Sequence, residues 1–504
     1  MLFSTAILFF SILNLLAIFY FSYFSFPTIK KYFLKIPKRI LLLLALLLVS
    51  SFFIKAFIYP NYFSLYLDDY YPIEAAKNIL NSDFKDLRYN FVPNGLLLVP
   101  SFLVLGADYR VAMLTMILIS ILALFLFFLF SCALTRNHWV SIIATSLIAF
   151  NASHIFYSFS AYNHTPVFFF IVLALFSFFL HLNSGNKDAL YLSMASILYL
   201  TLLRAEIFLL IPFLLFLYLK SNKSKLKKLN IWVPWLVFLF FLTLPFLKSI
   251  MFISEIENYP NTRFTIDNLS YNILNSAELL SLNYILIAIF FLGLILILIK
   301  KEWDILVILS TSFLFIILYF SLSYTHIYGG RLFHYSISIL YLVMAFGIVS
   351  TIEKAESKSL RPLVYLSLFA VLFIMQFGYA LKYIDEVKHS ESANKYYFDT
   401  RVPAFLSDII PENCIIVSPH PDKFTAATNL ASINIGTFNE SESSLRDKCY
   451  LFVDDLSCAY PEGINHCKSI KERYNLTMYT YIDTSMIRIP SKNMIINSTV
   501  YLIK

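Results

Sequence analysis

Two adjacent carboxylates, Asp68 and Asp69, stand just beyond an apolar run that is long enough to cross a bilayer. Aromatic residues flank the pair, because Tyr66 precedes it and Tyr70 and Tyr71 follow it. Two neighbouring like charges raise the pKa of one of the carboxyl groups, which makes that group a candidate base close to the membrane. We favour this reading over a pair of ordinary solvated acids.

The pair belongs to a polar segment, residues 59–108, that is far longer than a hairpin connection needs. Its other acids, Glu74, Asp83 and Asp86, are better explained as solvated surface. An apolar stretch at 92–106 is too short to span a bilayer, and we expect it to form a helix in the membrane interface.

Two arginines at the edges of apolar runs offer a second kind of chemistry. Arg204 lies next to Glu206 with little loop around it, and a charge near lipid is costly without a partner. It therefore either binds a phosphate or forms a salt bridge with Glu206. Arg331 follows two glycines in a turn that opens a helix, and its forked donors suit phosphate oxygens. For Arg331 we favour phosphate binding.

Aromatic, histidine and acidic side chains near the same boundary are candidates for contact with a donor or an acceptor. The alternative for the Tyr and His residues is interfacial anchoring, which is the commoner role of these residue types. The residues selected for such contacts are Tyr70, Tyr71, His164, Glu206 and Tyr328.

Membrane helices must position these residues. Of the 504 residues, 59% are hydrophobic and only 14% are charged, which no water-soluble globular chain needs. About twelve apolar segments approach the length of roughly 20 residues that a crossing requires. Their centres lie near Ile12, Leu48, Ile121, Leu147, Leu173, Ile197, Leu210, Leu239, Phe291, Phe313, Leu342 and Phe369.

The loops between these segments alternate in charge, so the net charge of +8 indicates membrane orientation rather than nucleic-acid binding. The long or acidic loops carry Asp68 and Asp69. The excess of cations predicts that the other loops are cytoplasmic, and that both termini and the acidic pair face outward. The basic loops lie near 30–39, 136, 187, 220–228, 300–301 and 354–361.

The first apolar run, residues 2–24, predicts an uncleaved helix rather than a signal peptide. No basic residue precedes it, and Lys30 and Lys31 follow it, which is the reverse of the charge order in a signal peptide.

The composition changes towards the C-terminus, which divides the chain into a membrane part, 1–383, and an outer domain, 384–504. Short β-rich runs at 414–418, 450–453, 486–490 and 500–503 predict a small α/β domain. Four cysteines there favour disulfides in an outward compartment, and a zinc site is the lesser alternative. Of the three connectivities that four cysteines allow, proximity favours Cys414–Cys449 and Cys458–Cys467.

The predicted fold class is thus an all-α polytopic membrane protein with a small extracytoplasmic α/β domain. The sequence has no Gly-rich phosphate loop, no dinucleotide fingerprint and no His-Glu-x-x-His helix. We therefore expect no nucleotide cofactor, and any donor would be held in the membrane.

The motif at 68–80 leads to a family. Asp68 and Asp69, followed by Ala76-Lys77-Asn78-Ile79-Leu80, resemble the Asp-Glu/Asp pair and the Ala-Arg/Lys-x-hydrophobic-Leu sequence in the first outer loop of GT-C glycosyltransferases. The resemblance is to the branch with protein O-mannosyltransferases and aminoarabinose transferases. It continues through the Pro-Asn-Gly stretch, Arg110, Arg204 and Arg331, and as an order of features it covers residues 40–380.

The resemblance implies a polyprenyl-phosphate sugar donor, an outward active site in the cell membrane and an inverting transfer to a protein, glycan or lipid. It implies that Asp68 is the base and that Asp69 positions the acceptor or a metal. Arg204 and Arg331 match basic positions near the lipid phosphate. Several relatives carry an acid where this chain has Tyr162-Asn163-His164, so a divalent metal and the acceptor type stay open.

Two other classes compete with an enzyme. A lipid or solute transporter would place ionisable residues in mid-membrane and often shows repeated halves. Here Lys55 and Lys248 lie near the outer ends of apolar runs, and no internal repeat is seen. A non-catalytic membrane scaffold is the third class.

Overall fold

The computed structural model contains a helical body, which is followed by a small sheet domain. It describes residues 2–62, 67–84, 89–158, 160–162, 164–225, 227–256, 284–321, 334–355, 360–388, 406, 409–411, 413–419, 421, 424–425, 431–435, 438, 449–454, 458, 461–482 and 498–503.

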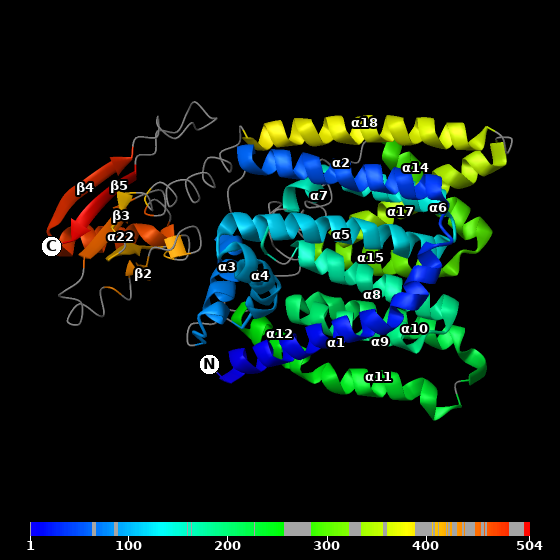
Figure 1. Ribbon diagram of the computed structural model, residues 1–504, viewed down its shortest axis with the longest axis horizontal. Helices are drawn as coiled ribbons and strands as arrows, with labels where there is room; N and C mark the ends of the chain where they lie inside the picture. Colours follow the sequence, from blue (N-terminus) through cyan, green and yellow to red (C-terminus); the bar gives the residue numbers. More distant parts are fainter. Residues whose placement is uncertain are drawn as a thin grey trace.

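Most helices of the body run along one common direction (Figure 1). The long or central ones are α1 (Leu2–Phe33), α2 (Lys38–Tyr62), α5 (Tyr109–Thr135), α6 (His138–Ala149), α8 (His164–Ser184), α9 (Lys187–Leu203), α10 (Leu210–Ser221), α11 (Leu229–Phe241), α12 (Thr243–Ile256), α14 (Tyr284–Lys300), α15 (Trp303–Ser321), α17 (His334–Ala355) and α18 (Arg361–Lys388). At one end lie the shorter α3 (Leu67–Leu80), α4 (Val92–Leu105) and α7 (Ala152–Tyr157). Two 3₁₀ turns, η1 (Ala205–Leu209) and η2 (Lys223–Lys225), complete the described elements of the body.

The apolar segments predicted from the sequence form helices, and all twelve predicted centres fall within one. Within the described ranges, six helices are long and apolar enough to cross a membrane, and six shorter apolar helices accompany them. The chain is therefore a mostly helical, multi-pass membrane protein. The helix expected at 92–106 is α4, and its place in the membrane interface stays a prediction.

Short polar side chains fix where several of these helices begin. Asp108 accepts a hydrogen bond from the backbone N–H of Arg110, and Asn137, Asn151 and Asn186 cap α6, α7 and α9 in the same way. Such caps satisfy N–H groups that lack a partner within the helix, which matters most where little water is available.

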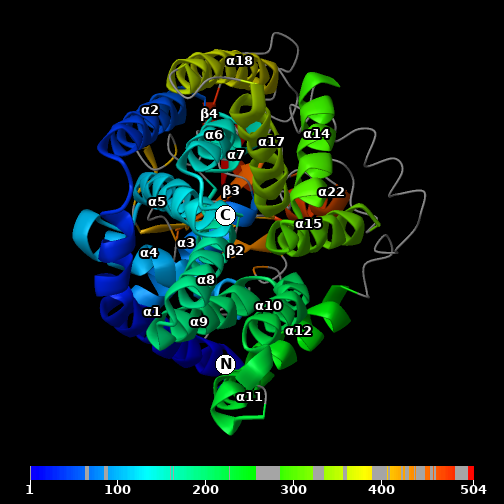
Figure 2. The same ribbon diagram turned by 90° about the vertical axis from the view of Figure 1, so that its right-hand side faces the viewer.

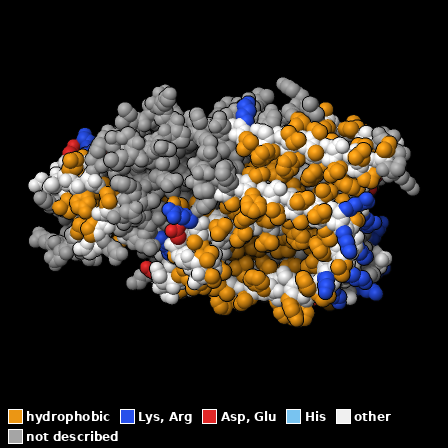
Figure 3. Space-filling model, turned by 45° about the horizontal axis from the view of Figure 1, so that its top comes forward, with side chains coloured by type: hydrophobic (Ala, Val, Ile, Leu, Met, Phe, Trp, Pro, Cys, Tyr) orange, Lys and Arg blue, Asp and Glu red, His pale blue; other side chains and the backbone are white. Residues whose placement is uncertain are grey.

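Burial divides the helices into an inner and an outer set. The described side chains of α5, α8, α9 and α17 are mostly buried, and α17 and α6 lie inside the bundle when it is viewed end-on (Figure 2). On α1 and α11 large apolar side chains are exposed, as with Phe19 and Phe240, each 71% exposed. Hydrophobic side chains cover the visible flank of the body (Figure 3), as expected for a surface solvated by lipid.

Lys and Arg side chains gather at the end of the body that lies farthest from the sheet domain (Figure 3). The turns between α1 and α2, α5 and α6, and α8 and α9 are at this end (Figure 1). The first residue of α1 and the sheet domain lie towards the opposite end. The predicted basic loops near 30–39, 136 and 187 thus share one end of the molecule.

The C-terminal domain is built on a five-stranded sheet in the order β2-β1-β3-β5-β4. β1 pairs in parallel with β2 and β3, whereas β5 pairs antiparallel with β3 and β4. The predicted runs at 414–418, 450–453 and 500–503 correspond to β1, β3 and β5, and the run at 486–490 lies outside the described residues. The elements are β1 (Cys414–Ser418), β2 (Ser432–Asn434), β3 (Cys449–Asp454), α22 (Pro461–Arg473), β4 (Leu476–Ile482) and β5 (Ser498–Ile503).

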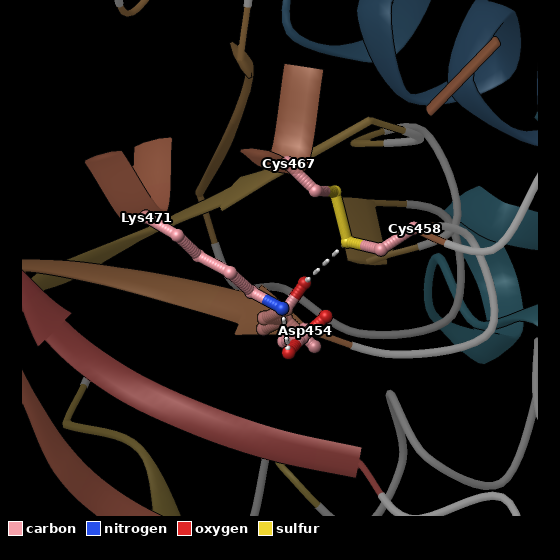
Figure 4. A network of polar contacts seen from close by, with 5 residues as sticks. Asp454, Cys458, Cys467 and Lys471 are labelled. Atoms are coloured by element: carbon pink, nitrogen blue, oxygen red, sulfur yellow. Dashed lines mark hydrogen bonds and ion pairs between the residues drawn. A yellow bond between two sulfur atoms is a disulfide. The ribbon is translucent and has the colours of Figure 1, made fainter. Parts of the chain in front are cut away.

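Two disulfides join the cysteines in the pairing that proximity favoured, Cys414–Cys449 and Cys458–Cys467. The first links β1 to β3, where its two residues are register partners. The second ties α22 to the segment after β3, beside an ion pair of 2.6 Å between Lys471 and Asp454 (Figure 4). The zinc alternative is therefore wrong for these four cysteines, because each of their sulfurs is bonded to another sulfur.

The helices α3 and α4 pack unusually closely, and Gly95 allows it. A Cβ atom on Gly95 would lie 2.8 Å from the Cβ of Ala75 and 2.9 Å from the backbone nitrogen of Ala76. Both distances are shorter than side-chain contacts in real proteins. Tyr199 of α9 supports the start of α4 by donating a hydrogen bond of 2.7 Å to the carbonyl oxygen of Pro93. α3 is thus held against the body through α4.

We expect Gly95→Ala to separate α3 from α4, because overpacking costs roughly 1–3 kcal/mol and backbone atoms cannot move aside. Thermal unfolding of the purified protein, followed by its helical circular dichroism signal, should show a lower unfolding temperature for Gly95→Ala than for wild type. Gly378→Ala is the matched control, since nothing lies within 4 Å of a Cβ added at that helical glycine. Equal unfolding temperatures for the two variants would contradict the close packing described above.

The two disulfides should stabilise the C-terminal domain unequally, because they close chain segments of different length. Cys414 and Cys449 are 35 residues apart, and Cys458 and Cys467 are 9 apart. Loop-closure entropy predicts that replacing Cys414 and Cys449 by serine lowers the free energy of unfolding by about 4 kcal/mol. Replacing Cys458 and Cys467 should lower it by about 3 kcal/mol. Pulse proteolysis of the domain in increasing denaturant measures this order, and the reverse order would contradict it.

Candidate active site

Asp68 and Asp69 lie in the first turn of α3, at the end of the body near the C-terminal domain (Figure 1). Their side chains are outside the part of the chain that the structure describes. Further along α3, the Cβ of Ala75 and the backbone at Pro72 and Ala76 lie against Gly95 of α4. The α3–α4 contact thus fixes the backbone that carries the acidic pair.

Part of α3 is buried in an apolar cluster. Tyr70, Ile73 and Ala76 are each fully buried, and the same cluster contains Leu98 and Phe102 of α4 and residues of α5. Tyr70 thus helps to hold α3 against the body, and its predicted contact with substrate stays a prediction.

A row of aromatic rings connects α3 to the start of α8. The Tyr71 ring stacks on the Phe91 ring with 4.7 Å between their centroids. The centroid of the Phe91 ring lies 6.1 Å from that of Tyr162, which in turn lies 5.3 Å from that of His164. His164 also packs on Tyr157 at 5.1 Å. Two of the predicted contact residues, Tyr71 and His164, are thereby brought into one cluster. Phe91 was not singled out in the sequence, since a lone Phe in an apolar chain gives no signal.

Arg204 lies at the C-terminal end of α9, where its backbone turns into an extended conformation. Its side chain is half-buried. Nearby, Lys248 of α12 is 6% exposed and donates a hydrogen bond to the carbonyl oxygen of Leu202. Two cations therefore approach the same helix end, where the carbonyl groups of the last turn favour positive charge.

Three other predicted residues cannot be placed in the site. Arg331 and Tyr328 lie outside the described residues, and α17 begins at His334, just after them. Glu206 is within η1, but its side chain is also outside the described part. Their predicted roles stay predictions.

A buried polar cluster formed by α2, α5 and α7 was not predicted as a site. Lys55 is fully buried, its Nζ donates to the Oγ of Ser120 at 2.5 Å, and it lies 3.2 Å from Nε2 of His154. Asn151 extends the network, because its amide donates to the hydroxyl oxygen of Tyr341 at 2.9 Å. The sequence signal was a lysine near the end of an apolar run, but nothing local identified its partners.

Lys77 in the last turn of α3 is the second lysine near the site. It is 9% exposed, and its Nζ donates to the backbone carbonyl of Thr425 in the C-terminal domain at 2.6 Å. Burial lowers the pKa of Lys77 to about 8, while the carboxylates of Asp108 and Glu74 act in the opposite direction.

The described side chains do not assemble a metal site. Among them, no three His, Cys, Asp or Glu residues lie close enough together to bind a metal ion.

Comparisons with known proteins give a result at the level of the fold. No protein-family model matches the sequence, and no curated protein sequence matches it. Two solved structures of ArnT from Cupriavidus metallidurans are similar. The one bound to undecaprenyl phosphate has a TM-score of 0.56 at 9% identity, and the one in the apo state has 0.58 at 8%.

Each comparison covers 91% of this chain and 97% of ArnT, so both the helical body and much of the C-terminal domain take part. An identity this low carries information about the fold alone. The resemblance that the sequence predicts, to the aminoarabinose-transferase branch of the GT-C glycosyltransferases, is confirmed for the fold.

Proposed function

We propose that this protein is a membrane glycosyltransferase that transfers a sugar from a polyprenyl-phosphate donor to an extracytoplasmic acceptor. The observation that carries the proposal is the likeness in fold to ArnT over 91% of the chain, in one case to a structure of ArnT bound to undecaprenyl phosphate. A lipid phosphate donor also agrees with the sequence, which has no nucleotide-binding motif.

The reacting groups would face outward. The Lys and Arg side chains at the far end of the helical body support this orientation, because cationic turns stay on the cytoplasmic side. The acidic pair on α3 and the disulfide-bonded domain would then both be outside the cytoplasm. Disulfides persist in that compartment.

In the proposed reaction, Asp68 takes the proton from an acceptor hydroxyl, and the oxygen forms a bond to the anomeric carbon of the sugar. The bond between that carbon and the phosphate oxygen breaks, and its electron pair leaves with the lipid phosphate. Attack from the face opposite the phosphate inverts the anomeric configuration. Asp69 would position the acceptor.

Cations would stabilise the charge that develops on the departing phosphate. We assign this role to Arg204 and Arg331, as the family resemblance implies. The half-buried position of Arg204 at the end of α9 supports the assignment, since low local water strengthens its interaction with an anion.

Asp68→Asn should reduce kcat by roughly 10²–10⁴-fold, because an amide cannot accept the proton. The assay follows sugar transfer from a synthetic polyprenyl-phosphate sugar by the full-length protein in lipid nanodiscs. Asp83→Asn is the matched control, an exposed acid that follows the same helix. If Asp68→Asn and Asp83→Asn were equally active, Asp68 would not be the base.

Arg204→Met should lower kcat/KM for the donor by roughly tenfold to a hundredfold, as expected when one hydrogen bond to a charged group is lost. Arg204→Lys keeps the positive charge but loses the forked guanidinium donors, so its kcat/KM should lie between those of wild type and Arg204→Met. Arg473→Met, which removes an exposed arginine of α22, should leave the kinetics unchanged. Unchanged donor kinetics in Arg204→Met would remove Arg204 from the phosphate site.

The competing transporter class predicts a different result in the same preparation. Protein reconstituted into liposomes would move a polyprenyl phosphate between leaflets and form no glycosylated product.

A further inference from the structure

One hydrogen bond joins the acidic-pair helix to the C-terminal domain across 348 residues of sequence. The Nζ of Lys77 in α3 donates to the backbone carbonyl of Thr425 at 2.6 Å. A lysine that is only 9% exposed is unusual, because burial disfavours its charged form. Because Lys77 is largely removed from water, its ammonium group depends on a protein acceptor such as the Thr425 carbonyl more than an exposed lysine would.

The position of Lys77 on α3 makes the contact relevant to the acidic pair. α3 has 14 residues, with Asp68 in its first turn and Lys77 in its last. Nine residues of the helix span roughly 13 Å. Pro72 lies between the two ends and supplies no backbone N–H, but α4 packs on the helix at Pro72 and Ala75. A shift at the Lys77 end is therefore transmitted towards the Asp68 end through a helix that α4 supports from the side.

The carbonyl that receives Lys77 is itself held firmly by the sheet. The Oγ1 of Thr425 lies 2.6 Å from the Oγ of Ser432, which in turn donates to the carbonyl of Pro421 at 2.7 Å. Ser432 is the first residue of β2, and it pairs with Ile416 of β1. The segment carrying Thr425 is thus clamped onto the edge strand of the sheet.

The disulfide Cys414–Cys449 continues this chain of contacts into the sheet, since it locks β1 to β3. The contacts lead from β3 through β1 and β2 to Thr425, and from there to α3. α3 is already held by α4 at Gly95 and by the apolar cluster around Tyr70. The hydrogen bond of Lys77 to Thr425 is the third support. Of the three supports described for α3, it is the one that comes from the C-terminal domain.

We propose that the C-terminal domain acts as a clamp on α3, and that Lys77 is a positioning residue that sets the placement of Asp68 through its contact with Thr425. The consequence for catalysis rests on the function proposed above, whereas the mechanical coupling does not. The domain would then support the chemistry of the membrane part even without touching the sugar.

The coupling is tested first without any activity assay. Full-length protein in nanodiscs is compared by hydrogen–deuterium exchange as wild type, Lys77→Met, Lys77→Arg and Lys468→Met. We expect amides of residues 71–80 to exchange on the order of tenfold faster in Lys77→Met, as expected when a charge-assisted hydrogen bond is lost. Amides in the middle of α5 should be unchanged.

The other two variants make this result specific. Lys77→Arg keeps a donor and should restore slow exchange. Lys468→Met removes an exposed lysine of α22 that pairs with Glu472 at 3.8 Å, and should match wild type. Wild-type exchange of α3 in Lys77→Met would overturn the proposal.

A second variant weakens the clamp from the side of the domain. Ser432→Ala removes the hydroxyl that holds Thr425, and should speed exchange in α3 in the same direction as Lys77→Met. The double variant should be no worse than Lys77→Met alone, because both changes break one chain of contacts. Additive effects would overturn the chain proposed here, and they would do so even if Lys77→Met alone lowered the stability of the protein.

The sugar-transfer assay then measures whether the contact between Lys77 and Thr425 affects the rate of the reaction. A positioning role predicts that Lys77→Met lowers kcat by roughly tenfold, with the donor KM within about twofold of wild type, and that Lys77→Arg restores kcat. A raised donor KM with unchanged kcat would instead make Lys77 a substrate ligand and overturn the positioning role. If wild type transferred no sugar, the proposed function would fail while the exchange experiment still decided the coupling.

Discussion

The candidate site depends on how a short helix is held at the end of an apolar bundle. α3 is too short and too polar to be fixed by lipid, so its placement has to come from direct contacts. Gly95 brings α4 to within van der Waals contact of Ala75 and Ala76, and Tyr70 is fully buried in an apolar cluster. Close packing of this kind has few alternative arrangements, because interiors at this density do not deform gradually. The backbone that carries Asp68 and Asp69 is held in place by this packing.

Buried cations are the second constraint on this end of the molecule. Lys55, Lys77 and Lys248 are each less than a tenth exposed, and each donates to a neutral oxygen of a hydroxyl or a backbone carbonyl. These oxygens supply acceptors for the buried ammonium groups, which is needed because burial without a hydrogen bond is costly for a polar group.

Much of the architecture could be predicted from the sequence, because the signals are local. An apolar run predicts a helix wherever it occurs, so all twelve segment centres fall in helices. Strands with four or more apolar and β-branched residues, such as β1 and β3, were found. β2 has only three residues, and the exposed β4 has no clean apolar run, so both were missed. Proximity in sequence was sufficient to favour both disulfides.

The sequence by itself determined that the chain crosses a membrane, which turns are basic, and where an acidic pair follows an apolar run. Each of these properties follows from the composition of a single stretch of residues. The tertiary structure decided that Tyr71 and His164 share a row of rings through Phe91, that Lys55 meets His154, and that Lys77 reaches Thr425. The two residues of each pair are 93 to 348 residues apart in the sequence, and no local pattern encodes them. They form only when packing brings distant surfaces together, because each contact is weak until the surrounding helices have already excluded solvent.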